Sequence, residues 1–223
     1  MKTLARDTST DYLTICVSDG AGILARLHRK APRSHSSLLV PMIDRVLKKA
    51  RLGIRDIDLF CMGVGPGSFT GLRIGAATVK GFAYVLGRDI AAVPTFDAIA
   101  MNAKRQSGVI CVVLDARKGK VYASFYRSDA RGQVDRISPY LLITAEELLK
   151  KCGSYDNLYF MGDYAHRLSP LPPGASVCGP RWHPRADRIA EIGRRMASNG
   201  ECVTAEKLEP MYLYSRECDI TGK

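Results

Sequence analysis

The predicted strands and helices occur in the same order twice along the chain. Each half reads as three strands, a helix, a fourth strand and a second helix, and each begins with an apolar strand ending in aspartate, at Asp7 and Asp115. The elements of the first half are expected at residues 3–7, 13–18, 23–28, 37–50 and 58–64 and in the helix after Gly71, and those of the second at residues 109–115, 121–127, 134–140, 144–152, 157–162 and 186–198. This order predicts an α/β fold in which a mixed sheet flanked by helices is formed twice.

A duplicated unit of this kind resembles the two-lobed fold of the actin, Hsp70 and sugar-kinase superfamily. The resemblance implies an N-terminal actin-like lobe at residues 1–102 and a second lobe at residues 103–202. The boundary is expected in the polar segment Asn102–Gly108, which separates the two predicted units.

The composition is that of a globular protein with a strong positive charge. The 223 residues are 46% apolar and carry a net charge of +11. No apolar run is long enough to span a membrane, and the seven cysteines include no Cys-x-x-Cys pair, so we expect a cytoplasmic protein with free thiols. The positive charge fits either a solvated surface or attraction to a polyanion such as tRNA, for example through Arg26, Arg29 and Arg33.

Residues 63–75 are the most distinctive segment, with the sequence Gly-Val-Gly-Pro-Gly-Ser-Phe-Thr-Gly-Leu-Arg-Ile-Gly. They lie between a predicted strand and a predicted helix, where backbone N–H groups can bind an anion. The segment lacks the Gly-Lys-Ser/Thr of a P-loop, and Thr70 stands where a dinucleotide loop has its third glycine. A tight strand-to-helix turn explains the glycines equally well, so Asp7, Gly65 and Gly67 are weak candidates for cofactor binding.

The sequence of this segment closely resembles that of the TsaB (YeaZ) family, bacterial proteins of tRNA threonylcarbamoyladenosine modification. Four further segments resemble that family in the same order, namely Leu4–Thr10, His35–Ile43, Asp115–Tyr122 and Glu209–Leu213. Arg6 departs from the pattern, because the family usually carries an apolar residue there. The resemblance covers nearly the full chain and implies that residues 203–223 pack back on the first lobe.

The resemblance implies a non-catalytic scaffold. Such a protein is expected to bind TsaD, which transfers a threonylcarbamoyl group to the adenosine beside the anticodon, and a TsaE-type ATPase would join the complex. A homodimer in isolation and tRNA contact through the complex are further implications, with no cofactor, metal or membrane. The alternative is a small ATPase or kinase of the same superfamily, and a peptidase is less favoured although the family carries an old glycoprotease label.

The two aspartate turns decide between a scaffold and an ATPase. Nucleotide-binding members of the superfamily place a glycine directly after each aspartate, whereas here Thr8 follows Asp7 and Ala116 follows Asp115. Short polar side chains in a turn commonly hydrogen-bond to nearby backbone N–H groups. We therefore interpret Asp7 as a turn cap rather than a phosphate-binding residue.

The sequence lacks the residue spacings that a metal site or a peptidase site would need. A His-x-x-x-His pair would place two metal ligands on one helix face, but Leu39 stands four residues after His35. Ser68 is not in a Gly-x-Ser-x-Gly sequence. No catalytic and no metal-binding residue is therefore predicted.

Two helices are predicted to form a protein interface instead. Apolar residues recur at helical spacing between Leu38 and Ala50, and small residues four apart follow Gly71. Part of each stripe must pack on the protein's own sheet, but small residues also let two helix backbones approach closely. The candidate interface residues are Leu38, Leu39, Met42, Phe69, Leu72, Gly75, Ala76, Val79 and Phe82. If this face points outward, Gly75→Glu is expected to give a folded protein that does not bind TsaD.

Overall fold

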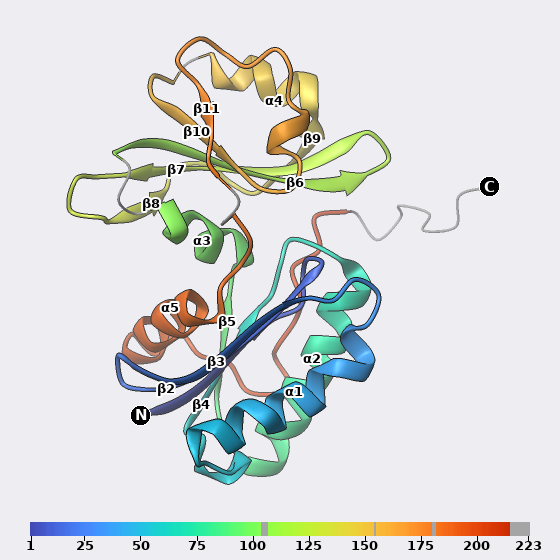
Figure 1. Cartoon of the computed structure of the whole chain (residues 1–223), viewed down its shortest axis with the longest axis vertical. Coiled ribbons are helices and arrows are strands. Elements are labelled where there is room, and N and C mark those ends of the chain that lie inside the picture. The colour runs from blue at the N-terminus through green and yellow to red at the C-terminus, as the bar shows by residue number, and fades with distance from the viewer. Residues whose placement is uncertain (104–106, 154, 180–181, 215–223) are drawn as a thin grey trace.

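The structure confirms an α/β fold in which a sheet with flanking helices is built twice. The computed structural model describes residues 1–103, 107–153, 155–179 and 182–214. Two mixed sheets lie one above the other in Figure 1, each with its own helices. Within these described ranges, no helix has the length and hydropathy needed to span a bilayer.

The first sheet has the strand order β3–β2–β1–β4–β5. The strand bounds are β1 Lys2–Asp7, β2 Tyr12–Asp19, β3 Gly22–Lys30, β4 Leu59–Gly63 and β5 Ile90–Val93. Strand β1 pairs antiparallel with β2 and parallel with β4. Because β1 and β4 run in the same direction, the aspartate turn after β1 and the glycine-rich segment after β4 meet at one edge of the sheet.

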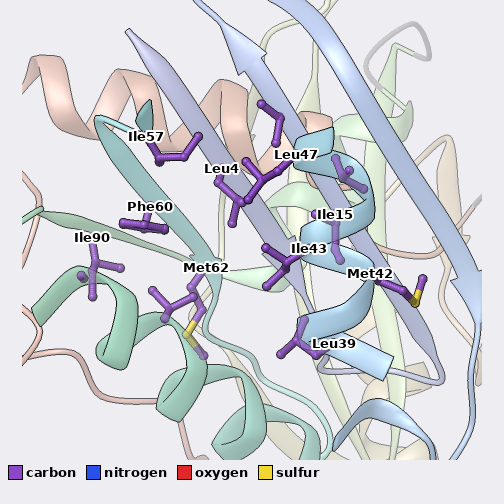
Figure 2. Close-up of a cluster of buried hydrophobic side chains, with 14 of the residues drawn as sticks. Leu4, Ile15, Leu39, Met42, Ile43, Leu47, Ile57, Phe60, Met62 and Ile90 are labelled. Carbon is purple, nitrogen blue, oxygen red and sulfur yellow. The ribbon is translucent and has the colours of Figure 1, made fainter. Parts of the chain in front are cut away.

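Helices α1 (His35–Ala50) and α2 (Phe69–Leu86) cover one face of this sheet. Figure 2 shows Leu39, Met42 and Ile43 of α1 in one buried cluster with Leu4 and Ile15 of the strands. These side chains are buried because α1 is amphipathic, with its apolar residues recurring at helical spacing on one face. The face that α1 and α2 turn toward the sheet is therefore core.

The second sheet has the order β11–β10–β6–β7–β8, and β9 also pairs with β7. The bounds in the second half are β6 Gly108–Arg117, β7 Lys120–Ser128, β8 Val134–Arg136, β9 Leu141–Thr144, α4 Ala145–Cys152, β10 Leu158–Met161 and β11 Ser176–Val177. The strand expected at residues 134–140 is thus only the short β8, and residues 141–144 form a separate strand. Helix α4 begins with a capping box between Thr144 and Glu147.

The last helix corrects the predicted lobe assignment. Helix α5 (Ala186–Ser198) was expected in the second lobe but packs on the first sheet, on the face opposite α1 and α2, with the short helix α3 (Thr95–Ala100) beside it. The strands present small side chains there, including Ala5, Cys61 and Ala91, so the helix can approach closely. Gly193 of α5 lies against Cys61 so tightly that a Cβ atom would overlap the sulfur.

The C-terminal segment also lies on the first lobe. Val203 forms a bridge with Ile90, and Leu208 is buried in the core under α2. The backbone N–H of Met211 then donates to the carbonyl of Val64, at 2.8 Å, just before the glycine-rich turn. Residues 215–223 of the segment predicted to return to this lobe lie outside the described residues.

An aromatic stack holds the connection into α5. His183 lies over both Tyr12 and His28, with ring centroids 4.2 Å apart in each case, and Trp182 meets Tyr12 edge-on. His28 is exposed over much of its surface. Burial of one ring face in the stack lowers its pKa to about 4, and the neighbouring His183 and Arg185 add to the effect while Asp187 opposes it. The stack thus holds a histidine that resists protonation.

We expect stability to fall as the pH drops from about 6.5 toward about 4, because the unfolded chain takes up a proton at His28 that the folded chain excludes. The change His28→Tyr keeps an aromatic ring and removes the titration of His28, while His183, whose pKa burial also lowers, still titrates. Its free energy of unfolding in urea should therefore vary less across this pH range than that of the native protein. The control is His166→Tyr at an exposed position. Equal pH dependence in all three proteins would contradict this expectation.

Candidate functional site

The glycine-rich segment packs directly against the turn that follows β1. A Cβ atom on Gly63 would overlap the Asp7 carboxylate, and one on Gly71 would overlap the Thr8 carbonyl oxygen. A Cβ atom on Gly67 would likewise overlap the Ser9 carbonyl oxygen. These glycines are therefore required because two pieces of the protein's own backbone and a buried carboxylate occupy the adjacent space.

Asp7 is buried and fully engaged by its own lobe. Its carboxylate accepts hydrogen bonds from the backbone N–H and the hydroxyl of Ser9, both at 2.7 Å, and from the Thr95 hydroxyl at 2.8 Å. Thr95 also accepts from the N–H of Gly65, at 3.1 Å. Burial raises the pKa of Asp7, and the bonds from Ser9 and Thr95 oppose that rise. The Asp7 carboxylate, together with Thr95, thus links the β1 turn, the glycine-rich segment and α3.

Arg6 lies on the other side of the same strand, fully buried beneath α2. Its Nη1 donates to the Thr8 hydroxyl at 2.9 Å, and that hydroxyl donates to the Gly71 carbonyl at 2.7 Å. Burial lowers the Arg6 pKa to about 9, although Asp7 opposes the shift. Nε and Nη2 have no hydrogen-bond partner among the described residues. The guanidinium stands where a Cβ of Gly75 would lie, so Arg6 determines how closely α2 approaches.

This position corrects the predicted interface. Gly75 faces inward onto Arg6, so Gly75→Glu is expected to disrupt the fold rather than only a partner contact. Leu38 and Phe82 are half-buried and Phe69 is exposed. The remaining candidates are buried in the protein's own core, namely Leu39, Met42, Leu72, Ala76 and Val79. Their helical spacing marks the face that packs on the sheet.

The outward face of the two helices consists of different residues. On α2 it carries the small Ala77 and Gly81 and then two large apolar side chains, Tyr84 and Val85, which are 71% and 80% exposed. Val40 of α1 is 50% exposed. An outward helix face is usually polar, but this one carries apolar residues. The sequence therefore indicates it only indirectly, as the side of the helix opposite the buried stripe.

The second aspartate turn is closed by ion pairs. The Asp115 carboxylate accepts from the Arg117 backbone N–H at 2.8 Å and lies 3.5 and 3.3 Å from the guanidinium groups of Arg117 and Arg167. Its own N–H donates to Asp163 at 2.8 Å. Asp115 is therefore held by cations of its own lobe.

The histidine that begins α1 is a structural residue. Its two ring nitrogens lie 2.8 Å from the carbonyl oxygens of Ala31 and Thr10, so His35 joins α1 to the β1–β2 turn. Within the described part of the chain, no three His, Cys, Asp or Glu side chains are grouped to hold a metal ion.

The family model and the curated relatives that match this chain concern the same tRNA modification. A family model described as TsaD, tRNA N6-adenosine threonylcarbamoyltransferase, matches residues 20–167. The tRNA threonylcarbamoyladenosine biosynthesis protein TsaB of Escherichia coli K12 is 32% identical over 219 residues, which cover 96% of this chain and 94% of that protein.

Solved structures agree with the sequence relatives. YeaZ from Pseudomonas aeruginosa superposes with a TM-score of 0.80 and 26% identity, covering 95% of this chain and 99% of that one. The activator of 2-hydroxyisocaproyl-CoA dehydratase from Clostridium difficile, solved with bound ADPNP, reaches a TM-score of 0.51 at 10% identity, covering 95% of this chain and all of that one. The last comparison shows a shared fold and nothing about ligands.

Two glycines in α2 should respond in opposite ways to alanine. Gly75→Ala places a methyl group against the enclosed Arg6 guanidinium and should lower the free energy of unfolding by about 1–3 kcal/mol. Gly81→Ala meets nothing within 4 Å and should raise it by up to about 1 kcal/mol, because alanine favours helix. Urea unfolding of both variants checks this. A Gly75→Ala variant as stable as Gly81→Ala would show that α2 does not rest on Arg6.

Proposed function

Because this chain belongs to the TsaB family of tRNA threonylcarbamoyladenosine biosynthesis proteins, we propose that it is a non-catalytic subunit that binds a TsaD-type transferase. The modified tRNA is the product of the partner's reaction. The chain contributes a docking face that positions or activates that partner.

The observation that carries this proposal is the exposed apolar end of α2. Tyr84 and Val85 are the most exposed of the large apolar side chains that the structure describes. Ala77 and Gly81 stand on the same helix, where their small size lets a second helix approach closely. Large apolar side chains and small residues together suit a helix that packs against another helix. Half-buried Leu38 of α1 and Phe82 of α2 remain candidate contacts.

The aspartate turns support a non-catalytic role. Asp7 already accepts three hydrogen bonds from its own lobe, and Asp115 is paired with two arginines. A phosphate-binding turn presents open backbone N–H groups and room for the ligand. The alternative function, a small ATPase or kinase, requires both turns to open.

Membership of the TsaB family also suggests further binding partners. A second copy of the chain could use the exposed face of α2 in isolation, which gives a homodimer that competes with the transferase. A TsaE-type ATPase and tRNA are expected to join through the complex rather than through the chain alone.

The test is a pair of substitutions at Gly81. Gly81→Arg adds a long charged side chain where nothing lies within 4 Å, so the fold should be kept. Desolvating that charge against a partner should weaken binding of the TsaD-type transferase by more than about tenfold and reduce tRNA modification in a reconstituted reaction to the same degree. Gly81→Ala is the matched control and should retain both.

Binding is measured by calorimetry and modification by analysis of the nucleosides. A folded Gly81→Arg protein that binds and supports modification normally would place the interface elsewhere. ATP hydrolysis by the purified chain, lost in Thr95→Ala, would instead favour the alternative enzyme.

A further inference from the structure

Helix α3 lies between the two sheets (Figure 1) and packs against both halves of the molecule. Of its six residues, all but Asp97 are buried. Ala98 packs with α5 and the first sheet, whereas Phe96 and Ile99 pack with strand β6 of the second sheet. A helix that is apolar on nearly every side needs an enclosed place of this kind. The helix is therefore shared between the two lobes.

Asp97 joins α3 to the second lobe by hydrogen bonds. Its Oδ1 accepts from the hydroxyls of Tyr126 in β7 and of Tyr140 just before β9, at 2.7 and 2.8 Å. Tyr126 is buried and Tyr140 is half-buried. Burial and the charge of Asp97 raise the pKa of both phenols, although Arg136 opposes the rise for Tyr140. Both hydroxyls therefore stay protonated and available as donors.

Thr95, at the start of the same helix, joins α3 to the glycine-rich segment of the first lobe. Its buried hydroxyl donates to Asp7 at 2.8 Å and accepts from the N–H of Gly65 at 3.1 Å. Only Phe96 separates Thr95 from Asp97, so the links to the two lobes lie within one helical turn. A displacement of Asp97 is therefore also a displacement of Thr95.

Packing between the lobes is incomplete beside Asp97. A cavity of about 140 Å³ lies there, lined by Ile192 of α5 on one side and by Tyr126 and Val134 of the second sheet on the other. Charged side chains of both signs also line it, namely Asp97, Asp135, Arg136 and Arg195. Where space is left between two elements, side-chain packing alone does not fix their relative position. The two tyrosine hydrogen bonds to Asp97 therefore restrain the second sheet on this side of α3.

We propose that α3 is a connector that couples the position of the second lobe to the contact between Asp7 and the glycine-rich segment. A displacement of the second sheet pulls on Asp97 through its two tyrosine bonds. Because Thr95 lies in the same helical turn, this displacement also changes the bonds that its hydroxyl makes to Asp7 and Gly65. A partner that rotates the second lobe loosens the glycine-rich turn at the start of α2 in this way. By the same coupling, a partner that tightens this turn stabilises the present arrangement of the lobes.

The experiment measures amide hydrogen exchange residue by residue in the purified chain. In the double variant Tyr126→Phe/Tyr140→Phe, the amides of Gly65 and Ser9 should exchange about tenfold faster, because two hydrogen bonds to a charged acceptor are lost. The amide of Ile15, on a strand that is paired on both sides, should exchange at the native rate. Asp97→Asn keeps an acceptor oxygen without the charge and should accelerate the same two amides by a smaller factor.

The matched control is Tyr159→Phe, which removes a phenol hydroxyl from β10 of the same sheet and should leave all three amides unchanged. If the double variant does not fold, Tyr140→Phe at its half-buried position repeats the test with a smaller expected change. Native exchange at Gly65 and Ser9 in a variant whose α3 and second sheet exchange faster would overturn the coupling, and so would native exchange throughout. Equal acceleration at Ile15 would also overturn it, because it would show a loss of overall stability. The chain is measured alone, so the result does not depend on binding of the transferase.

Discussion

The buried contact between the β1 turn and the glycine-rich segment determines the arrangement of the first lobe. Thr8, Ser9 and Asp7 fill the space that side chains at Gly63, Gly67 and Gly71 would need, and Arg6 fills the space beside Gly75 one turn further along α2. Helix α2 therefore lies close to the sheet with one fixed face inward. Its outward face, and so the surface available to a partner, follows from this contact.

The same contact also engages the aspartate that ends β1. Here the Asp7 oxygens are occupied by Ser9 and Thr95, and the neighbouring backbone is packed without room for a side chain. The contact leaves the outward face of α2 exposed, with the large apolar side chains Tyr84 and Val85 toward the end of the helix.

Much of the fold could be predicted from the sequence, because apolar periodicity and the repeated element order report local structure directly. The position of α5 could not, since an apolar helix face does not indicate which sheet it covers. The contact here depends on small residues of the first sheet such as Ala5 and Cys61. The inward direction of Gly75 was also missed. Small residues four apart look alike whether they face a partner or a buried arginine, and Arg6 was visible only as a departure from the family pattern.

Nucleotide binding by the purified chain tests most directly whether the contact at Asp7 is closed. Amide hydrogen exchange of residues 7–11 and 63–75 is followed with and without an excess of MgATP. We expect identical exchange in both conditions, because the carboxylate and the adjoining backbone are already engaged within the lobe. Protection by MgATP confined to these two segments would contradict that expectation and would make the chain a nucleotide-binding protein in its own right.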